Sequence, residues 1–272
     1  MQSSDTTKAS ASSSSNSEEE ASIIDSITAR ESQKTAEQKA QDKSTCEQYV
    51  QNGLKRDVTV QFLYERLLKL GCRPPDDLIR CVDCGTKPVA AGFGVVEEID
   101  VSTTADSSTT TTRKANGGNS SSSCAQTQQE INTLIAKQND GAATLKLLPD
   151  IFLCQQNIQN ETHARESMAH ELIHAIDMCR TKMDPINNCI HMACTEIRAE
   201  NLAGECHWLR ELQRGRMGTN FVGHGAECVK RRAIRSVKAN PNCAEKAADY
   251  VDAAFDRCFK DTFPFDRHPN LR

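Results

Sequence analysis

The 272-residue chain has no run of about 18 apolar residues, the length that a transmembrane helix needs, so the sequence predicts no membrane span. It also lacks a marked excess of one charge: the net charge is −4 and the pI is about 6.0. The longest basic cluster, VKRRAIRSVK at 229–238, alternates with apolar residues, which favours a solvated helix face over a phosphate-binding surface. We therefore expect no nucleic-acid partner.

The first segment lacks the apolar core that a secretory signal carries. Residues 1–20, MQSSDTTKASASSSSNSEEE, are acidic and poor in arginine, so we expect neither a secretory signal nor an ordinary mitochondrial presequence there. Serine, glutamate, lysine and alanine dominate further on, and this composition predicts a disordered tail over 1–44. Residues 45–272 are expected to form a single domain with a low-complexity insertion at about 101–141, which begins with a Ser/Thr-rich stretch.

Cysteine, by contrast, is abundant and dispersed. The thirteen cysteines are Cys46, Cys72, Cys81, Cys84, Cys124, Cys154, Cys179, Cys189, Cys194, Cys206, Cys228, Cys243 and Cys258. This pattern indicates disulfide bonds formed in an oxidising compartment. It disagrees with the first segment, which predicts no secretory signal. Cys81 and Cys84 could instead belong to a structural zinc site completed by Cys72 and Cys154, although disulfides are favoured. Because the count is odd, at least one cysteine stays free or pairs between chains if no metal uses it.

Residues 165–180, RESMAHELIHAIDMCR, contain two histidines four positions apart. On a helix, His170 and His174 lie on one face and can turn both imidazoles toward one zinc ion. Glu171 sits about 100° around the helix from His170, beside the metal, where it can take a proton from water at the metal. The pattern predicts a catalytic zinc site, and a helix with a chance histidine pair is the alternative.

Helical structure around this motif has its own support in the sequence. Ala169, Leu172 and Ile173 begin an apolar side that Ile176 continues at helical spacing. Asn160 is a candidate N-cap, followed by an acidic residue in the first turn. A helix of this kind makes a chance match less plausible.

A catalytic zinc usually has three protein ligands and one open position. Glu196, in the segment ACTEIRAEN, is the candidate third ligand, and His191, Glu200 and His207 are its rivals. Small residues on the same face would let two helices approach closely: Ala193, Ala199 and Ala203. Asp177 could orient a ligand histidine without touching the metal.

The remaining pattern predicts a mixed fold. A helix is expected over 58–72, where Val60, Leu63, Leu67 and Leu68 recur at helical spacing, and strands are expected near 90–100 and 145–154. EINTLIAK at 130–137 could form a short helix. After a break at 184–188, helices are expected at about 191–214, 223–240 and 242–261. We expect an α+β, zincin-like, disulfide-rich metallopeptidase with a small sheet, an active-site helix and a helical C-terminal part.

These stretches together resemble the family of mitochondrial inner-membrane metalloproteases that process and help to assemble the membrane-embedded part of ATP synthase. The matching text is HELIHAIDMCR, HMACTEIRAENLAGEC, ECVKRRAIRSVKANPNC and DRCFKDTFPFD, preceded by CRPPDDLIRCVDC, a short GFG and LLPDIFLCQQN. The resemblance covers most of 46–266 and leaves out the tail and the Ser/Thr-rich insertion. The spacing from HELIH to ACTEIRA and RRAIRSV makes it specific, because the histidine motif alone occurs in many families.

The resemblance implies one catalytic Zn²⁺ with His170 and His174 as ligands and Glu171 as the catalytic glutamate. It implies a zinc metalloendopeptidase that lies peripherally on the intermembrane-space side of the mitochondrial inner membrane. Such a protein would remove the presequence of an ATP synthase Fo subunit precursor and assist Fo assembly. The resemblance also implies import by oxidative folding without a cleavable presequence. This would explain many cysteines in a chain for which no secretory signal is predicted. Cys124 and Cys189 lie outside the family pattern, and we expect one or both to be free thiols.

Two other functions remain open on sequence grounds. A non-proteolytic assembly chaperone with a structural zinc site would have no need of Glu171 as a general base, so the intact glutamate favours the peptidase. An intracellular binding protein with reduced cysteines is the third reading, and it disagrees with the number and spread of the cysteines.

Overall fold

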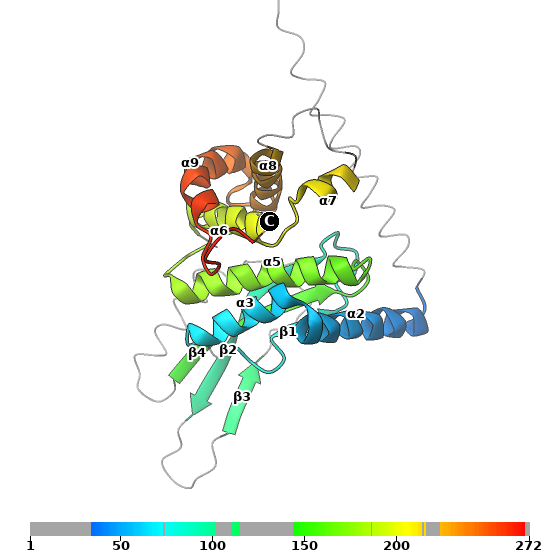
Figure 1. The fold of residues 1–272 in the computed structure, drawn as a ribbon. Helices are drawn as coiled ribbons and strands as arrows, with labels where there is room; N and C mark the ends of the chain where they lie inside the picture. Colours follow the sequence, from blue (N-terminus) through cyan, green and yellow to red (C-terminus); the bar gives the residue numbers. More distant parts are fainter. Residues whose placement is uncertain are drawn as a thin grey trace, which may run out of the picture.

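The computed structural model describes residues 34–72, 74–101, 110–114, 144–185, 187–213, 215 and 224–269 of the 272-residue chain (Figure 1). Its helices are α2 (Ala36–Arg56), α3 (Val58–Lys69), α5 (Glu161–Arg180), α6 (Cys189–Leu202), α7 (Trp208–Gln213), α8 (His224–Lys238) and α9 (Ala247–Lys260), with a 3-10 turn η1 (Ala244–Lys246) before α9. Its strands are β1 (Ile79–Val82), β2 (Ala91–Val101), β3 (Thr110–Lys114) and β4 (Thr144–Cys154).

A small mixed sheet lies ahead of α5 in the chain, as the α+β prediction requires. Its strand order is β1-β4-β2-β3. β1 runs parallel to β4, with Ile79 opposite Ile151, whereas β2 runs antiparallel to both β4 and β3. The strands predicted near 90–100 and 145–154 are therefore confirmed as β2 and β4.

Two apolar clusters build the core, and α6 contributes to both. One cluster joins α2, α3 and the sheet to α5, and it includes Leu63, Ile151 and Leu172. The other joins α6 to α8 and α9, and it includes Ile197 and Val251. Figure 1 shows α5 crossing the molecule between these two parts, with α6, α8 and α9 on one side and α2, α3 and the sheet on the other. The described chain thus has the small sheet and helical C-terminal part expected from the sequence.

The helix α2, which precedes the first helix predicted from the sequence, was not expected. α2 starts at Ala36, inside the segment that was expected to be a disordered tail, whereas residues 1–33 lie outside the described part. Thr35 and Gln38 form a capping box: the Thr35 side chain accepts from the Gln38 N–H, and the Gln38 side chain accepts from the Thr35 N–H. The proposed boundary at residue 44 therefore falls within α2 rather than before it.

The insertion expected at about 101–141 is described only where its backbone forms the end of β2 and β3. The short helix considered for EINTLIAK lies outside the described residues. In α3, which confirms the predicted first helix, Val60, Leu63 and Leu67 are buried but Leu68 is 49% exposed. Leu68 follows Leu67 by one residue, about 100° around the helix, which turns it away from the buried stripe.

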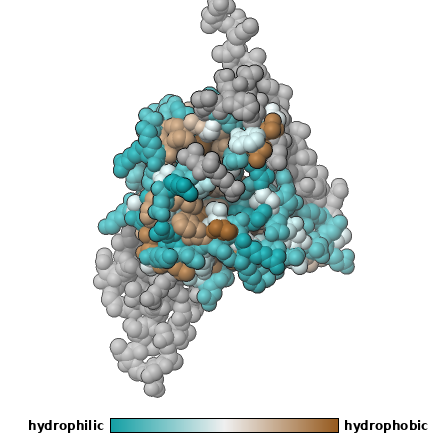
Figure 2. Space-filling view, in the orientation of Figure 1, coloured by the Kyte–Doolittle hydropathy of each residue, from teal (hydrophilic) through white to brown (hydrophobic). Residues whose placement is uncertain are grey.

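The single helix predicted over 191–214 is wrong, because the chain breaks between α6 and α7. Gly204 has a φ of 88°, a left-handed conformation that favours glycine and ends a helix. α7 is then held by charged contacts, in which Arg210 pairs with Glu166 of α5 and Glu211 pairs with Arg231 of α8. Figure 2 shows hydrophobic residues at its upper right, over the region of α7. Within α7, the side chains of Trp208, Leu209 and Leu212 are exposed.

Disulfide bonds account for twelve of the thirteen cysteines. The pairs are Cys46–Cys81, Cys72–Cys179, Cys84–Cys154, Cys189–Cys243, Cys194–Cys258 and Cys206–Cys228. The disulfide prediction for Cys81 and Cys84 is confirmed, and each has a partner that rules out the shared zinc site considered for them. The expectation of a free thiol is wrong for Cys189, and Cys124 lies outside the described residues.

None of the helices in the described ranges combines the length and the apolar character needed to cross a membrane.

Candidate metal centre

The centre is built on α5, whose start and buried side follow the sequence prediction. The Asn160 side chain accepts a hydrogen bond of 2.9 Å from the His163 N–H, which confirms the N-cap, and Glu161 lies in the first turn. Leu172 and Ile176 are fully buried and fix the rotation of the helix against the core. That rotation brings the motif histidines to the side of α5 that faces α6.

His170, His174 and Glu196 converge at the crossing of α5 and α6, with their ligand atoms all within 4.8 Å of one another. His170 Nε2 lies 3.6 Å from Glu196 Oε2, and His174 Nε2 lies 3.7 Å from Glu196 Oε1. Ligand atoms bonded tetrahedrally to zinc at about 2.0–2.2 Å lie roughly 3.3–3.6 Å apart. The described side chains are therefore already close to the spacing that a zinc site needs.

The hydrogen bonding of the three residues also fits a cation. Glu196 Oε2 is buried and has no hydrogen-bond partner in the described part of the chain. Buried carboxylate oxygens nearly always have a partner, so an oxygen without one, 3.6 Å from the His170 imidazole, matches the chemistry of a metal ligand. Two histidines and one glutamate are a known ligand set of catalytic zinc.

Glu171 is buried close to His170 and Glu196 and is not one of the three converging ligands, as its position on the helix predicts. Burial raises the pKa of Glu171 to about 7; the positive charge of His170 opposes this shift, and the charges of Glu196 and Glu200 add to it. A carboxyl group with a pKa near neutrality can both accept and donate a proton.

The two histidines have opposite pKa shifts. For His170, burial acts to lower the pKa, but the contact with Glu196 and the charge of Glu171 outweigh it and raise the pKa to about 9. For His174, burial dominates and lowers the pKa to about 4. The two imidazoles also lower the pKa of Glu196 to about 2, although burial acts to raise it. A cation that takes the Nε2 lone pair of His170 therefore has to displace a proton.

A buried chain of hydrogen bonds supports His174. His174 Nδ1 lies 2.8 Å from Thr195 Oγ1, and the Thr195 hydroxyl donates to Asp177 Oδ2 over 3.1 Å. Asp177 is fully buried and also accepts from Arg198 Nε at 2.9 Å. Asp177 thus supports a candidate ligand, as the sequence suggested, but it does so through Thr195, which the sequence analysis did not single out.

Two carboxylates that are paired with an arginine lie beside the imidazole of His170. His170 Nδ1 lies 3.4 Å from Glu205 Oε1, and Arg232 bridges Glu205 and Glu200. His170, Glu200 and Glu205 could by spacing hold a metal themselves. The guanidinium of Arg232 already pairs with both carboxylates, so this group is better suited to orient His170 than to bind a second cation.

The other rivals to Glu196 lie elsewhere. His191, near the start of α6, accepts a hydrogen bond of 3.1 Å at Nδ1 from the Asp184 N–H, which closes the turn before that helix. His207 lies in the turn before α7, where its N–H bonds to the Gly204 carbonyl and its ring lies near Trp208. Neither belongs to a group of converging ligands among the described residues.

Known proteins resemble the chain over a little less than half of its length. It is 48% identical over 118 residues to the mitochondrial inner membrane protease atp23 of Aspergillus clavatus, covering 43% of this chain and 49% of the relative. The corresponding protein of Coccidioides immitis is 47% identical over 119 residues, covering 43% and 49%. The mitochondrial inner membrane protease ATP23 homolog of Xenopus laevis is 46% identical over 124 residues, covering 45% and 52%. The chain spans about half the length of the curated relatives it matches.

No solved structure matches the chain. The model of the Peptidase M76 family matches residues 44–266, which include every residue of the centre described above. This confirms the resemblance to mitochondrial inner-membrane proteases on which the sequence interpretation relied. The chain therefore belongs to the Peptidase M76 family.

Proposed function

We propose that the chain is a zinc metalloendopeptidase in which His170, His174 and Glu196 hold one catalytic Zn²⁺ and Glu171 is the general base. The observation that supports this most directly is the convergence of the three ligand atoms within 4.8 Å, next to a buried glutamate that is not one of them. The family match and the relatives named proteases support the same class of reaction.

Each residue of the centre has a task in peptide hydrolysis. A zinc ion held by the three ligands supplies Lewis acidity and lowers the pKa of a water molecule. Glu171 takes a proton from the attacking water and delivers it to the amide nitrogen of the bond that breaks. Thr195 and Glu205 keep the two imidazoles turned toward the same point. The surrounding architecture, a small sheet followed by the metal helix, is proposed to be zincin-like.

We extend the proposal to the protein's setting. The substrate would be the presequence of an ATP synthase Fo subunit precursor, and the protein would also assist Fo assembly. It would lie peripherally on the intermembrane-space side of the mitochondrial inner membrane. The names of the relatives support an inner-membrane setting, and six disulfide bonds support an oxidising compartment. The alternative function is that of a non-proteolytic chaperone with a structural zinc. The following experiment distinguishes it from the peptidase.

The test compares the chain with its Glu171→Gln variant on the Fo subunit precursor. The variant removes the proton acceptor and keeps all three ligands, so we expect cleavage to fall by about 10²–10⁴-fold while the zinc content stays at one ion per chain. Glu227→Gln, at an exposed position of α8, is the matched control and should cleave normally. Cleavage by Glu171→Gln at the rate of the unaltered chain would contradict the assignment, and an unaltered chain that binds zinc without cleaving would favour the chaperone.

A further inference from the structure

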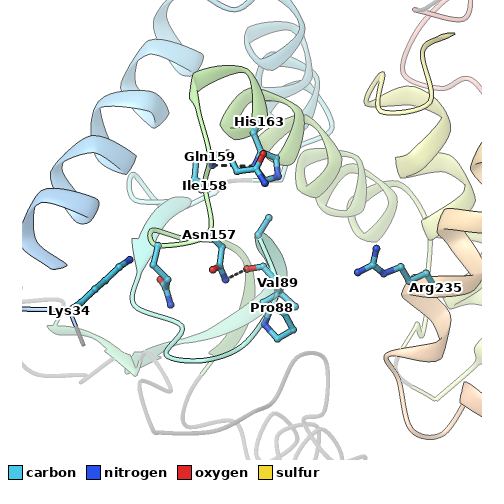
Figure 3. Close-up of a pocket in the computed structure, with 10 residues that line it drawn as sticks. Lys34, Pro88, Val89, Asn157, Ile158, Gln159, His163 and Arg235 are labelled. Carbon is cyan, nitrogen blue, oxygen red and sulfur yellow. Dashed lines mark hydrogen bonds between the residues drawn. The ribbon is translucent and has the colours of Figure 1, made fainter. Parts of the chain in front are cut away.

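A cavity of about 620 Å³ opens at the N-terminal end of α5, apart from the proposed metal ligands (Figure 3). Residues 88–90, which lead into β2, form one wall, and residues 156–159, which connect β4 to α5, form another. His163 lines it from the first turns of α5, and Lys34 and Arg235 stand at its sides. Four segments far apart in the sequence therefore meet around one space.

The ionisable side chains among the described residues that line this cavity are all basic. The described part of its lining contains Lys34, Arg235 and His163 but no carboxylate, in a chain whose net charge is −4. Lys34 is already engaged with Asp42 at 2.7 Å. Arg235 is exposed and forms no ion pair or hydrogen bond with the other described residues, and Figure 3 shows it reaching from α8 toward Pro88 and Val89. An open guanidinium above a wall of amides and aliphatic groups is complementary to a carboxylate on a short aliphatic stem.

The cavity lies within a few peptide residues of the proposed metal centre. His163 precedes His170 by two helical turns, so both lie on the same side of α5, about 10.5 Å apart along its axis. An extended peptide covers that length in about three residues. On the opposite side, Ser236 follows Arg235 directly on α8, and its side chain interacts with the carboxylate of Glu196. The two helices that contribute to the cavity, α5 and α8, thus both extend to the proposed ligands.

We propose that this cavity is a subsite for an acidic side chain of the polypeptide substrate, with Arg235 as the residue that pairs with its carboxylate. The inference rests on the proposed peptidase function, and it adds a substrate preference that the metal centre itself does not provide. The acidic residue would stand about three positions from the bond that is cleaved. Arg235 acts here on binding and takes no part in the proton transfers assigned to Glu171.

The test uses two series of short fluorescent peptides built from alanine, serine, leucine and phenylalanine. One series carries a single glutamate moved from position to position, and the other carries glutamine in its place. Binding is measured by anisotropy to the zinc-loaded Glu171→Gln chain, and cleavage by the unaltered chain is mapped by mass spectrometry. We expect glutamate to bind about two- to fivefold more tightly than glutamine at one favoured position, the range for one solvent-accessible ion pair. Raising the salt concentration should reduce the difference.

The decisive variant is Arg235→Glu, combined with Glu171→Gln for binding. It should abolish the preference for glutamate and create one for lysine at the same position. Lys238→Glu makes the same charge change one turn further along α8, outside the cavity, and should keep the preference for glutamate.

Three outcomes contradict the subsite: no preference for glutamate at any position, a preference that survives Arg235→Glu, or equal weakening of the glutamate and glutamine series by Arg235→Glu. A preference for glutamate that depends on Arg235, without cleavage by the unaltered chain, would support the subsite and contradict the peptidase function.

Discussion

At the scale of single residues, Thr195 determines which nitrogen of His174 is free for a metal. Asp177 accepts hydrogen bonds from Arg198 and from the Thr195 hydroxyl, so the Thr195 proton is directed toward Asp177. Thr195 Oγ1 must then accept from His174 Nδ1–H, and this leaves the lone pair of His174 Nε2 facing Glu196. A single hydroxyl thus selects the tautomer that a zinc ligand needs.

Replacing Thr195 by valine keeps the shape of the side chain and removes this hydroxyl. We expect Thr195→Val to weaken zinc binding by about 10–100-fold, the usual cost of losing a residue that orients a ligand. Thr195→Ser keeps the hydroxyl and is the matched control, which should bind zinc within a few-fold of the unaltered chain. Titration against a chromogenic chelator measures both, and zinc affinity that is unchanged in Thr195→Val would refute the role of the hydroxyl.

The sequence was sufficient to predict the proposed metal ligands and the proposed general base, but not the residues that support them. His170, His174 and Glu171 follow from the helical repeat, and Glu196 follows from ligand chemistry on a neighbouring helix. Glu205 could not be found in this way, because it reaches His170 only after the chain turns at Gly204. Its place depends on tertiary structure, for which the spacing of residues along one helix gives no signal.

At the scale of elements, a buried ionic network joins α5 to α6 and to the segment after α9. Asp177 on α5 pairs with Arg198 on α6, and both side chains are fully buried. Arg198 also donates to the carbonyl groups of Asp261 and Phe263, and Arg180 pairs with Asp261 at 2.5 Å. The crossing of the two metal-bearing helices is therefore fixed next to the centre itself.

Asp261 makes this network sensitive to acid. Burial acts to raise the pKa of Asp261, but Arg180 and Arg198 outweigh it, so its folded pKa lies below the ordinary value. A carboxyl group with a lowered pKa stabilises the fold above its unfolded pKa of about 3.9, and this contribution is lost as the pH falls through the folded value. Because Asp261 is about one-third exposed, we expect a contribution of no more than about 1 kcal/mol.

Urea unfolding of the unaltered chain and Asp261→Asn, with all disulfides intact, tests this expectation. The unaltered chain should be the more stable at neutral pH, and the difference should shrink as the pH falls below about 4. Asp249→Asn, in the first turn of α9, changes a carboxylate outside the network and serves as the comparison. A difference between the unaltered chain and Asp261→Asn that is the same at every pH would contradict the role given to this carboxylate.

The elements were predicted best where the repeat of apolar residues was long. The helix over 165–180 and the strands β2 and β4 follow directly from such patterns. The break at Gly204 was missed because leucines and alanines continue at helical spacing on both sides of it. The helix α2 was missed although its start has a readable signal, a threonine followed three residues later by a glutamine, which the low-complexity composition obscured.

At the scale of the whole molecule, disulfide bonds tie both metal-bearing helices to the rest of the chain. Cys72–Cys179 joins the end of α5 to the loop after α3. Cys194–Cys258 joins α6 to α9, and Cys189–Cys243 holds the start of α6. Each closed loop is expected to stabilise the fold by about 2–4 kcal/mol, mainly by restricting the unfolded chain. Reduction should therefore loosen the helices that carry the metal ligands.

Counting the free thiols of protein isolated from its own compartment measures how many cysteines are paired in disulfide bonds. With twelve of thirteen cysteines paired, we expect at most one thiol per chain under denaturing, non-reducing conditions. Reduction before the assay should raise the count and lower the activity. Ten or more thiols without reduction would contradict the disulfide framework and remove the structural support for an oxidising compartment.

The position of the metal itself tests the central claim most directly. Crystals of the zinc-loaded chain, measured on both sides of the zinc absorption edge, would locate every bound zinc ion by its anomalous signal. We expect one ion, about 2.0–2.2 Å from His170 Nε2, His174 Nε2 and a carboxylate oxygen of Glu196, with one position left open for water. A zinc ion held by Glu200 and Glu205, or a closed site with four protein ligands, would contradict the catalytic centre proposed here.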